Sequence, residues 1–476
     1  MNTLKKLTAL FLTLILVLSV AACTQNPEPT QQGTEPAPTG TGELPGTGGI
    51  PDVDLNGFEL ILGDWWSPAV YEEKDPTTAW EQMVQDYNHE IEEKMNFTFQ
   101  EIGLQNRGDY DEVLINSFIA DDPVCNVFYG HPESVIPMAA QGLLYDLSTL
   151  DAFDFENDSK WSQSVIEYFT IHGKIYAARP SEDQPRLGIL FNKRLLEEAG
   201  VDPDLPYDLQ AAGQWDWEHF EELCQKLSKD TDNDGITDIY AMGGNDVELM
   251  TVGIYGNGAK FVDRDENGLF VDGTLNPAFE EGLNWSVSLI QKGYCREIGA
   301  GDAWDKAYTD FANAQTAMLC SQTWVIETYL SGMSDKFGYV MLPAGPKGHN
   351  CTPMYPTPIC IPSCLDEETA NNVALIINTR FDNNKNIEGA REMGVTFRDD
   401  YYNIFSDSRA VDETVTSMVT DPACQVYDSY YLIPNYEYYG YTVAVAAQTA
   451  TAAEKIEELR PTNQAAIDAA NAMFGN

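Results

Sequence analysis

The sequence predicts an α/β protein with a chain long enough to form two lobes. Short apolar runs alternate with amphipathic helical patterns from residue 58 onward, which is typical of a largely parallel sheet covered by helices. The chain has 476 residues, whereas single hydrophobic cores seldom grow beyond ~250–300 residues. Hydrophobic residues make up 43% of the chain, as in ordinary globular proteins.

The N-terminal 55 residues are expected to lie outside the globular part. Lys5 and Lys6 precede an apolar run that ends at residue 22, which is the pattern of a secretory signal peptide over residues 1–22. Residues 23–55 are rich in Pro, Gly and Thr and lack apolar periodicity, so we expect a flexible tether.

The end of the signal segment predicts a lipid anchor. Val20-Ala21-Ala22-Cys23 looks like a bacterial lipobox, and an ordinary signal peptide followed by a chance cysteine is the alternative interpretation. Because a tether follows directly, we favour lipidation of Cys23, which would attach the protein to the outer face of the cell membrane.

The first predicted lobe begins with alternating strands and helices. The expected elements are a strand at 58–63, a helix opened by Pro76, a strand at 97–102, a helix at 110–118 and a strand at 124–129. Ligands of such sheets bind beyond the carboxyl ends of the strands. Two segments stand at such positions: Asp64-Trp65-Trp66, and the loop that starts at Tyr129 and contains His131.

A second set of elements runs from residue 173 to residue 242. The apolar run 187–191 predicts a buried strand, and the helix after it should end at Gly200, where a left-handed residue is needed. Asp216 is placed to cap a further helix with Trp217, Phe220, Leu223 and Leu227 on its apolar face. Farther along, we expect helices at 276–292 and 443–459, and a helix that passes into a strand within 311–324.

The order of several motifs resembles one family, the extracellular solute-binding proteins of carbohydrate-type ABC importers (family 1). The motifs are Gly173-Lys-Ile-Tyr-Ala-Ala-Arg-Pro180, Phe191-Asn-Lys with Leu195-Leu-Glu-Glu-Ala-Gly-Val201, the 217–235 segment that ends in Asp-Gly, and Leu342-Pro-Ala-Gly-Pro346. The resemblance extends from Phe58 to the C-terminus. It departs from the family at Ala314-Gln315, where Gly-Lys is usual, and at residues 123–126, where Pro-Asp is frequent.

The resemblance implies a two-lobe, periplasmic-binding-protein-like fold with a hinge and an interlobe ligand cleft. Lobe one would comprise residues 56–178 plus 344–385, and lobe two residues 179–343 plus 386–476. A monomeric binding protein, not an enzyme, would capture a sugar or oligosaccharide and deliver it to the permease subunits of the transporter.

Aromatic residues are the main candidates for ligand contacts, because the C–H faces of sugars stack on Trp and Tyr rings. We expect Trp65, Trp66, Trp324 and Tyr439, the last within the 436–441 cluster, to line the cleft. Their polar partners would be Asp64, Tyr129, His131 and either Glu182 or Asp183. Trp80, Trp217 and Trp285 lie on apolar helix faces and are expected in the core.

An acidic loop resembles the opening of a calcium site. Asp230, Asp232, Asp234 and Asp238 could supply carboxylates and Ile236 its carbonyl, but Ala241 occupies the twelfth position, where a bidentate Glu is usual. One interpretation is a structural Ca²⁺ with further ligands from elsewhere or from water, and the other is a solvated acidic turn. No cofactor is otherwise required.

Charge and motifs exclude other classes. The formal net charge of −48 argues against nucleic-acid binding, and there is no H-x-x-x-H pair, Walker loop, G-x-G-x-x-G or G-x-S-x-G. The eight cysteines after Cys23 permit disulfides or buried thiols. The alternatives left open are a binding protein for peptides, polyamines or another solute, an extracellular carbohydrate-active enzyme, and a ligand sensor.

Overall fold

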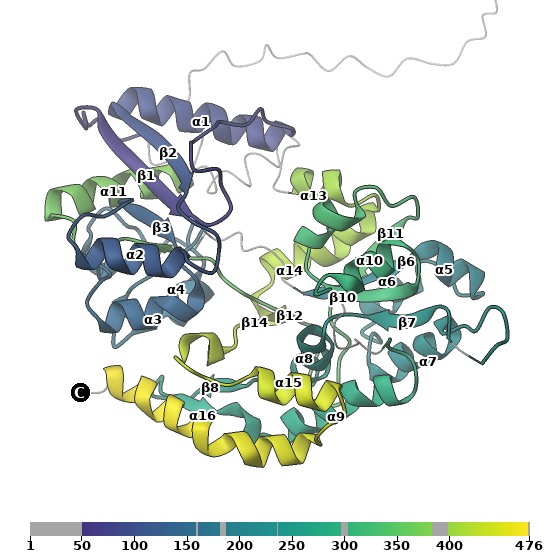
Figure 1. Ribbon diagram of the computed structural model, residues 1–476. Helices are drawn as coiled ribbons and strands as arrows, with labels where there is room; N and C mark the ends of the chain where they lie inside the picture. Colours follow the sequence, from purple (N-terminus) through teal and green to yellow (C-terminus); the bar gives the residue numbers. More distant parts are fainter. Residues whose placement is uncertain are drawn as a thin grey trace, which may run out of the picture. The chain divides into compact units, whose positions relative to one another are not determined.

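The computed structural model describes residues 50–158, 160–180, 187–235, 237–296, 303–382 and 398–474 (Figure 1). The predicted signal peptide, Cys23 and most of the tether lie outside these residues. The chain forms two four-stranded sheets, in the orders β13-β3-β1-β2 and β11-β6-β10-β7. The α/β fold class predicted from the sequence is confirmed.

The first sheet is built mainly from the N-terminal part of the chain. Its strands and helices are β1 (Phe58–Asp64), α1 (Ala79–Met95), β2 (Phe97–Gly103), α2 (Tyr110–Ile119), β3 (Val127–Tyr129), α3 (Pro132–Ala140), η1 (Leu147–Thr149), α4 (Gln163–Phe169), β4 (Thr170–Ile171), β5 (Lys174–Ile175), β13 (Ile359–Cys360) and α11 (Glu367–Arg380). β1 is parallel to β2, from Phe58↔Phe97 to Asp64↔Gly103, and parallel to β3, whereas the edge strand β13 is antiparallel.

Helices cover both faces of this sheet. Leu60 and Leu62 of β1 pack with α1 and α11 in one core cluster, and Phe128 of β3 packs in a second cluster with α2 and α3 (Figure 1). The two faces of the sheet therefore enter separate cores. Polar groups that must remain accessible are therefore expected in the loops at the ends of the strands.

Helix α1 begins later than the sequence indicated. The sequence predicts a helix opened by Pro76, but the first helical residue is Ala79, because Thr78 and Glu81 form a capping box. In the segment before β1, Leu55 is buried and its N–H donates to the carbonyl oxygen of Met95, at 2.8 Å.

The second sheet is mixed. Its region contains β6 (Gly188–Asn192), α5 (Lys193–Glu198), α6 (Leu205–Ala211), α7 (Trp217–Leu227), β7 (Tyr240–Gly243), α8 (Asp246–Gly256), β8 (Val262–Arg264), β9 (Phe270–Asp272), η2 (Gly273–Leu275), α9 (Pro277–Gln291), α10 (Lys306–Ala312), β10 (Thr316–Ser321), η3 (Ile326–Leu330), β11 (Phe337–Val340) and β12 (Thr352–Pro353). β6 is antiparallel to both β10 and β11, whereas β7 is parallel to β10.

Several local predictions in this region are confirmed. Gly200 has φ +73°, as the end of α5 requires. The Asp216 carboxylate caps α7 by accepting the His219 N–H at 3.0 Å. Trp217 stacks on Trp285 with ring centroids 4.4 Å apart, which places both in the core region.

The C-terminal part forms α13 (Arg398–Ile404), η5 (Ala410–Val415), α14 (Thr416–Thr420), η6 (Pro422–Cys424), β14 (Gln425–Val426), η7 (Ser429–Leu432), α15 (Tyr439–Ala446) and α16 (Ala452–Phe474). The sequence predicts a single helix over 443–459. Two helices form instead, because Gln448 has φ +55° and Thr451 caps α16 through Glu454. The cysteines 125, 224, 295, 320, 351, 360, 364 and 424 are free.

No helix among the described residues has the length and apolar character that spanning a membrane requires.

One buried ion pair joins segments that are distant in the sequence. Lys160 is fully buried, and its Nζ lies 2.8 Å from carboxylate oxygens of Asp154 and Asp382 and 3.0 Å from the carbonyl oxygen of Asn378. Burial raises the pKa of Asp154, but Lys160, Asn157 and Trp161 outweigh it and lower the pKa to about 2. Stability from this pair is therefore present above pH 3.8 and is lost as the pH falls through about 2.

Replacing Lys160 by methionine should destabilise the protein strongly. Lys160→Met leaves the Asp382 carboxylate buried without its cation, so the free energy of unfolding should fall by about 3 kcal/mol. The measurement is urea unfolding at pH 7. The matched control is Lys94→Met, because Lys94 forms an exposed i,i+4 pair with Glu90 at 2.6 Å; this change should cost less than about 0.5 kcal/mol. Equal effects of the two variants would contradict the prediction.

Candidate functional site

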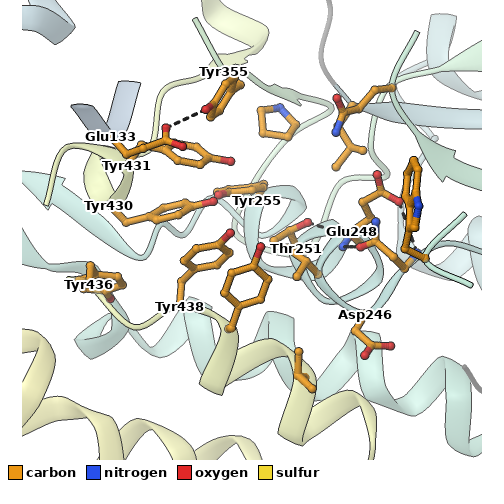
Figure 2. Close-up of a pocket in the computed structure, with 18 of the residues that line it drawn as sticks. Glu133, Asp246, Glu248, Thr251, Tyr255, Tyr355, Tyr430, Tyr431, Tyr436 and Tyr438 are labelled. Atoms are coloured by element: carbon orange, nitrogen blue, oxygen red, sulfur yellow. Dashed lines mark hydrogen bonds between the residues drawn. The ribbon is translucent and has the colours of Figure 1, made fainter. Parts of the chain in front are cut away.

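A cavity of about 710 Å³ is lined by residues from distant parts of the chain (Figure 2). Its residues come from the loop before α2, from α3, from α8, from the segment that enters α10, and from β12 with the loop after it. The C-terminal segment from η7 to α15 completes it. The lining is mainly aromatic and apolar, with a few polar groups, as in small-molecule sites generally.

Seven tyrosines form what we call the tyrosine wall: Tyr255, Tyr355, Tyr430, Tyr431, Tyr436, Tyr438 and Tyr439. Apart from Tyr255, the rings of these tyrosines pack on one another, with centroids 4.0 Å apart for Tyr430 and Tyr431 and 4.7 Å apart for Tyr430 and Tyr438. Tyr439 lies 4.1 Å from Tyr438 and is 55% exposed. Figure 2 shows the Tyr255, Tyr430 and Tyr438 rings close together on one side of the cavity. The wall thus offers a continuous set of ring faces and hydroxyl groups.

A charged triad stands at one end of the tyrosine wall. The Arg107 guanidinium donates to the Tyr355 hydroxyl at 2.9 Å and to the Glu133 carboxylate at 3.3 Å. The Tyr355 hydroxyl in turn donates to Glu133 at 2.7 Å (Figure 2). Burial alone would lower the pKa of Arg107, but Tyr355 and Glu133 outweigh it and raise the pKa. The Tyr355 ring meets Tyr431 edge to face at 4.8 Å, so the triad fixes the orientation of a cavity ring.

The N-terminus of α8 places two further carboxylates at the cavity. Asn245 caps the helix in a capping box with Glu248, and Glu248 also accepts the Tyr308 hydroxyl at 3.2 Å. Glu248 is only 6% exposed. Burial raises the pKa of Asp246, which also lines the cavity. Both acids can accept hydrogen bonds from ligand hydroxyl groups.

A second aromatic group, the tryptophan rim, consists of Trp304, Tyr308, Trp324 and Tyr329. Trp304 lines the cavity and is 69% exposed. Its ring lies 6.4 Å from Trp324, whose indole N–H donates to the cavity residue Gln322 at 2.8 Å. The rim stands on α10, on the residues just before it and on the segment after β10, and it is separate in sequence from most of the tyrosine wall.

The residues predicted to bind ligand fall into three groups. Tyr439 lines the cavity, and Trp324 packs behind Trp304 and Gln322. The other described candidates gather at the carboxyl ends of β1 and β3 and are not among the cavity-lining residues; they are Asp64, Trp65, Trp66, Tyr129 and His131. Glu182 and Asp183 lie outside the described residues. The ligand roles of all of them stay predictions.

The β1–β3 group is held by its own contacts. Trp65 lies 4.0 Å from the His131 ring and Trp66 lies 5.1 Å from Tyr129. Asp64 is fully buried, and its carboxylate accepts the N–H groups of Trp66 and Ser67 at 2.8 and 2.7 Å. This arrangement turns the chain sharply after β1 and leaves Trp66 half exposed.

The same turn depends on a glycine and places Glu101 beside Asp64. The Gly103 N–H donates to the Pro68 carbonyl at 2.9 Å, and a Cβ at Gly103 would lie 1.9 Å from the Ser67 oxygen. Burial raises the pKa of Glu101, and Asp64 raises it further, while Ser67 lowers it.

Most of the tyrosine wall and its polar neighbours were not predictable from sequence motifs. Only the 436–441 cluster stands out, whereas Tyr430 and Tyr431 come from a segment that matches no motif. Tyr255 and Tyr355 stand alone in their segments. A second tyrosine pair within a few residues of the recognised cluster was the one available signal.

The acidic loop brings three carboxylates together. Carboxylate oxygens of Asp230, Asp232 and Asp238 lie within 4.8 Å of one another, and all three residues are exposed. Asp230 accepts the N–H groups of Asp234 and Gly235, the latter at 2.8 Å. Ile236 lies outside the described residues, and Ala241 is buried in β7. The donor set of oxygens fits a hard cation, but it is smaller than the six to eight ligands that Ca²⁺ takes.

The family of the chain is established by comparison with known proteins. Residues 72–380 match the model for bacterial extracellular solute-binding proteins, which is well over half of the chain. The protein belongs to this family. A comparison with curated proteins finds no match.

Solved structures agree with this assignment at the level of fold. A cyclic α-maltosyl-1,6-maltose binding protein from Arthrobacter globiformis is 17% identical, with a TM-score of 0.62 over 86% of this chain and 99% of that one. An ABC substrate-binding protein from Listeria monocytogenes in complex with cycloalternan is 16% identical, with a TM-score of 0.57 over 88% and 100%. UgpB from Mycobacterium tuberculosis in complex with glycerophosphocholine is also 16% identical, with a TM-score of 0.56 over 84% and 98%.

The comparisons confirm the two-lobe, periplasmic-binding-protein-like fold that the sequence resemblance implied. The family and these neighbours are binding proteins, and the chain is a solute-binding protein rather than an enzyme.

Replacing Asp64 should lower the pKa of Glu101. The Asp64→Asn change removes the neighbouring carboxylate that raises the pKa of Glu101, although burial continues to raise it. A pH titration of the Glu101 carboxyl carbon by NMR would measure the shift. Ser67→Ala serves as the opposite control, because the lost Ser67 hydrogen bond, 3.3 Å long, should raise the pKa of Glu101. A pKa that is unchanged in the Asn variant would refute the coupling.

Proposed function

We propose that this protein captures a sugar or oligosaccharide outside the cell and delivers it to the permease subunits of an ABC transporter. The tyrosine wall carries the proposal, because ring faces stack on the C–H faces of sugars. Around it, Glu133, Asp246, Glu248 and Gln322 offer acceptors for hydroxyl groups. The Arthrobacter and Listeria structures, one named for binding a cyclic oligosaccharide and the other in complex with one, support this ligand class.

The two separate aromatic groups favour a ligand of several sugar units. The tyrosine wall and Trp304 belong to different segments that line one cavity of about 710 Å³. A single sugar ring could cover only part of the aromatic surface of this cavity. We therefore propose that one sugar unit packs on the wall and another on Trp304.

The proposed lobes are residues 56–178 plus 344–385 and residues 179–343 plus 386–476. Glu133 would then belong to lobe one and Tyr430 to lobe two, and both line the cavity. A ligand that contacts both lobes favours their closed arrangement, which the permease would recognise.

The N-terminal cysteine and the acidic loop have further proposed roles. Acyl chains on Cys23 would hold a monomer at the outer face of the cell membrane. The acidic loop with Asp230, Asp232 and Asp238 would bind a structural Ca²⁺, with further ligands from water. The family description as extracellular supports the location.

A second candidate ligand is a positively charged solute such as a polyamine. It is favoured by one observation: three acids line the cavity, Glu133, Asp246 and Glu248, against two cations, Arg107 and Lys306. Lys306 is paired with Asp310, so the excess of negative charge lies toward α8.

A thermal-shift screen tests the function. The purified protein would be mixed separately with maltotetraose, cycloalternan, glycerophosphocholine, spermidine and a tetrapeptide. A ligand that binds the folded state at 100 times its Kd stabilises it by about 2.7 kcal/mol. Stabilisation by a glycan without turnover supports the proposal. Stabilisation by spermidine alone, or by the peptide alone, would show that the ligand is that solute and not a sugar. Hydrolysis of a glycan during the incubation would contradict a binding role.

Trp304→Ala should weaken glycan binding without loss of stability. Because the ring is 69% exposed in the absence of ligand, its removal should leave the unfolding midpoint unchanged. Affinity for the glycan that stabilises the protein most should fall about tenfold, or about 1.4 kcal/mol, in titration calorimetry. Ile119→Ala removes an apolar side chain that is 64% exposed at the end of α2 and outside the cavity, and it should bind like the wild type. Equal affinities of Trp304→Ala and the wild type would remove Trp304 from the site.

Calcium should raise the melting temperature if the acidic loop binds it. We expect a rise of about 2 °C or more at saturating Ca²⁺, because binding to the folded state alone is stabilising. Asp232→Asn should abolish the rise, whereas Asp263→Asn, at an acid outside the loop, should keep it. A rise that persists in Asp232→Asn would place the ion elsewhere.

A further inference from the structure

One buried carboxylate lies behind the tyrosine wall. Asp428 directly precedes η7 and is 1% exposed. Its side chain accepts backbone N–H groups from Phe261 at 2.7 Å, Val262 at 3.1 Å and Tyr430 at 3.1 Å. The Tyr255 hydroxyl also hydrogen-bonds to it. Asp428 is not among the cavity-lining residues.

The hydrogen bonds of Asp428 join three segments that lie next to the cavity. They connect α8, through Tyr255, with the start of β8 and with η7, through Tyr430. Tyr255 and Tyr430 both line the cavity (Figure 2). In addition, the backbone carbonyl of Asp428 accepts the Tyr168 hydroxyl of α4 at 2.6 Å. One carboxylate therefore sets the relative positions of two wall tyrosines that are far apart in sequence.

Keeping this carboxylate buried is unfavourable for folding. Burial raises the pKa of Asp428 from 3.8 to about 6, against the three N–H bonds and the Lys260 charge, which lower it. The folded state therefore binds more protons than the unfolded state between about pH 4 and pH 6, and stability falls as the pH rises through that window. A group that costs stability at neutral pH, and lies directly behind a ligand cavity, is typical of a functional constraint.

Several charged and titratable groups face Asp428. Lys260 is its cationic neighbour and is paired with Asp263 at 3.4 Å. Arg264 of β8 donates to the Tyr168 carbonyl at 2.6 Å. The surrounding hydroxyls belong to Tyr168, Tyr255, Tyr430 and Tyr436, and burial raises their pKa values, so they stay neutral near pH 6.

We propose that Asp428 is a positioning residue of the ligand cavity, whose ionised carboxylate holds Tyr255 and Tyr430 in the tyrosine wall and so sets ligand affinity. This inference rests on the proposed function, because it assigns the wall to the ligand. An ionised carboxylate accepts on both oxygens, whereas a protonated acid or an amide presents a donor on one side. When Asp428 is protonated or replaced by Asn, at least one of the N–H or O–H groups that point at it loses its acceptor. Tyr255 and Tyr430 are then held less firmly in the tyrosine wall.

The experiment combines Asp428→Asn with a change of pH. Affinity for maltotetraose, an uncharged probe, would be measured by calorimetry on the full-length protein at pH 7 and pH 5. Wild-type affinity should fall about tenfold at pH 5, where about one tenth of a group with pKa 6 is ionised. The variant should bind about tenfold more weakly than the wild type at pH 7 and show no further loss at pH 5.

A second readout needs no ligand. The near-UV circular dichroism of the stacked tyrosines should titrate with a midpoint near pH 6 in the wild type and not in Asp428→Asn. The matched control is Asp146→Asn, because Asp146 also caps a short helix, η1, and accepts N–H groups from Ser148 and Ile175, both at 3.2 Å. It lies outside the cavity, so its affinity and pH profile should match the wild type.

Failure of the role proposed for Asp428 can be distinguished from failure of the proposed function. A wild-type near-UV signal that does not change between pH 7 and pH 5, or an Asp428→Asn variant with wild-type affinity and pH profile, would overturn the role of Asp428. Failure of the wild type to bind any glycan would overturn the proposed function instead, while the near-UV titration still decides whether Asp428 positions the wall. If Asp428→Asn does not fold, the wild-type pH titration provides the decision.

Discussion

Burial of the first sheet on both faces is the constraint on which the arrangement of this protein depends. Leu60 and Leu62 of β1 face one helical layer, while Phe128 of β3 faces the other. With both faces closed, polar and aromatic groups that must remain accessible can stand only at the strand ends. The turn after β1, the aromatic pairs around Trp65 and Trp66, and the neighbouring cavity residue Glu133 all result from that restriction.

The chemistry of the cavity combines fixed rings with fixed charges. Arg107, Tyr355 and Glu133 satisfy one another, and Glu248 is held by Tyr308 and by the helix it caps. In the proposed binding role, such mutual satisfaction would limit the rearrangement that a ligand must induce, and thus the entropy lost on binding. Tyr439 and Trp304 are the exceptions, because both are more than half exposed.

Features that depend on neighbouring residues were predictable from the sequence, whereas features formed by residues distant in the sequence were not. The Asp216 cap, the left-handed Gly200 and the packing of Trp217 depend on neighbours within a few residues, and their patterns identified them. Antiparallel β6 depends on partners elsewhere in the chain. The break at Gln448 is local, but the apolar periodicity of residues 443–459 did not reveal the cap that Thr451 and Glu454 form there. The cavity is the extreme case, since Arg107, Tyr255, Tyr355 and Tyr430 acquire a common role only through the fold. Short-range periodicity contains no information about contacts between residues that are far apart in the sequence.

The contribution of late segments to early ones has a consequence for biogenesis. The edge strand β13 of the first sheet comes from residues 359–360, and the tyrosine wall is completed by residues 430–439. A chain that is synthesised N-terminus first therefore cannot close its first sheet, or assemble its cavity, until most of its length has been made. Truncated or stalled chains would display an open edge of the first sheet and an incomplete cavity, and such an edge is prone to pair with strands of other chains.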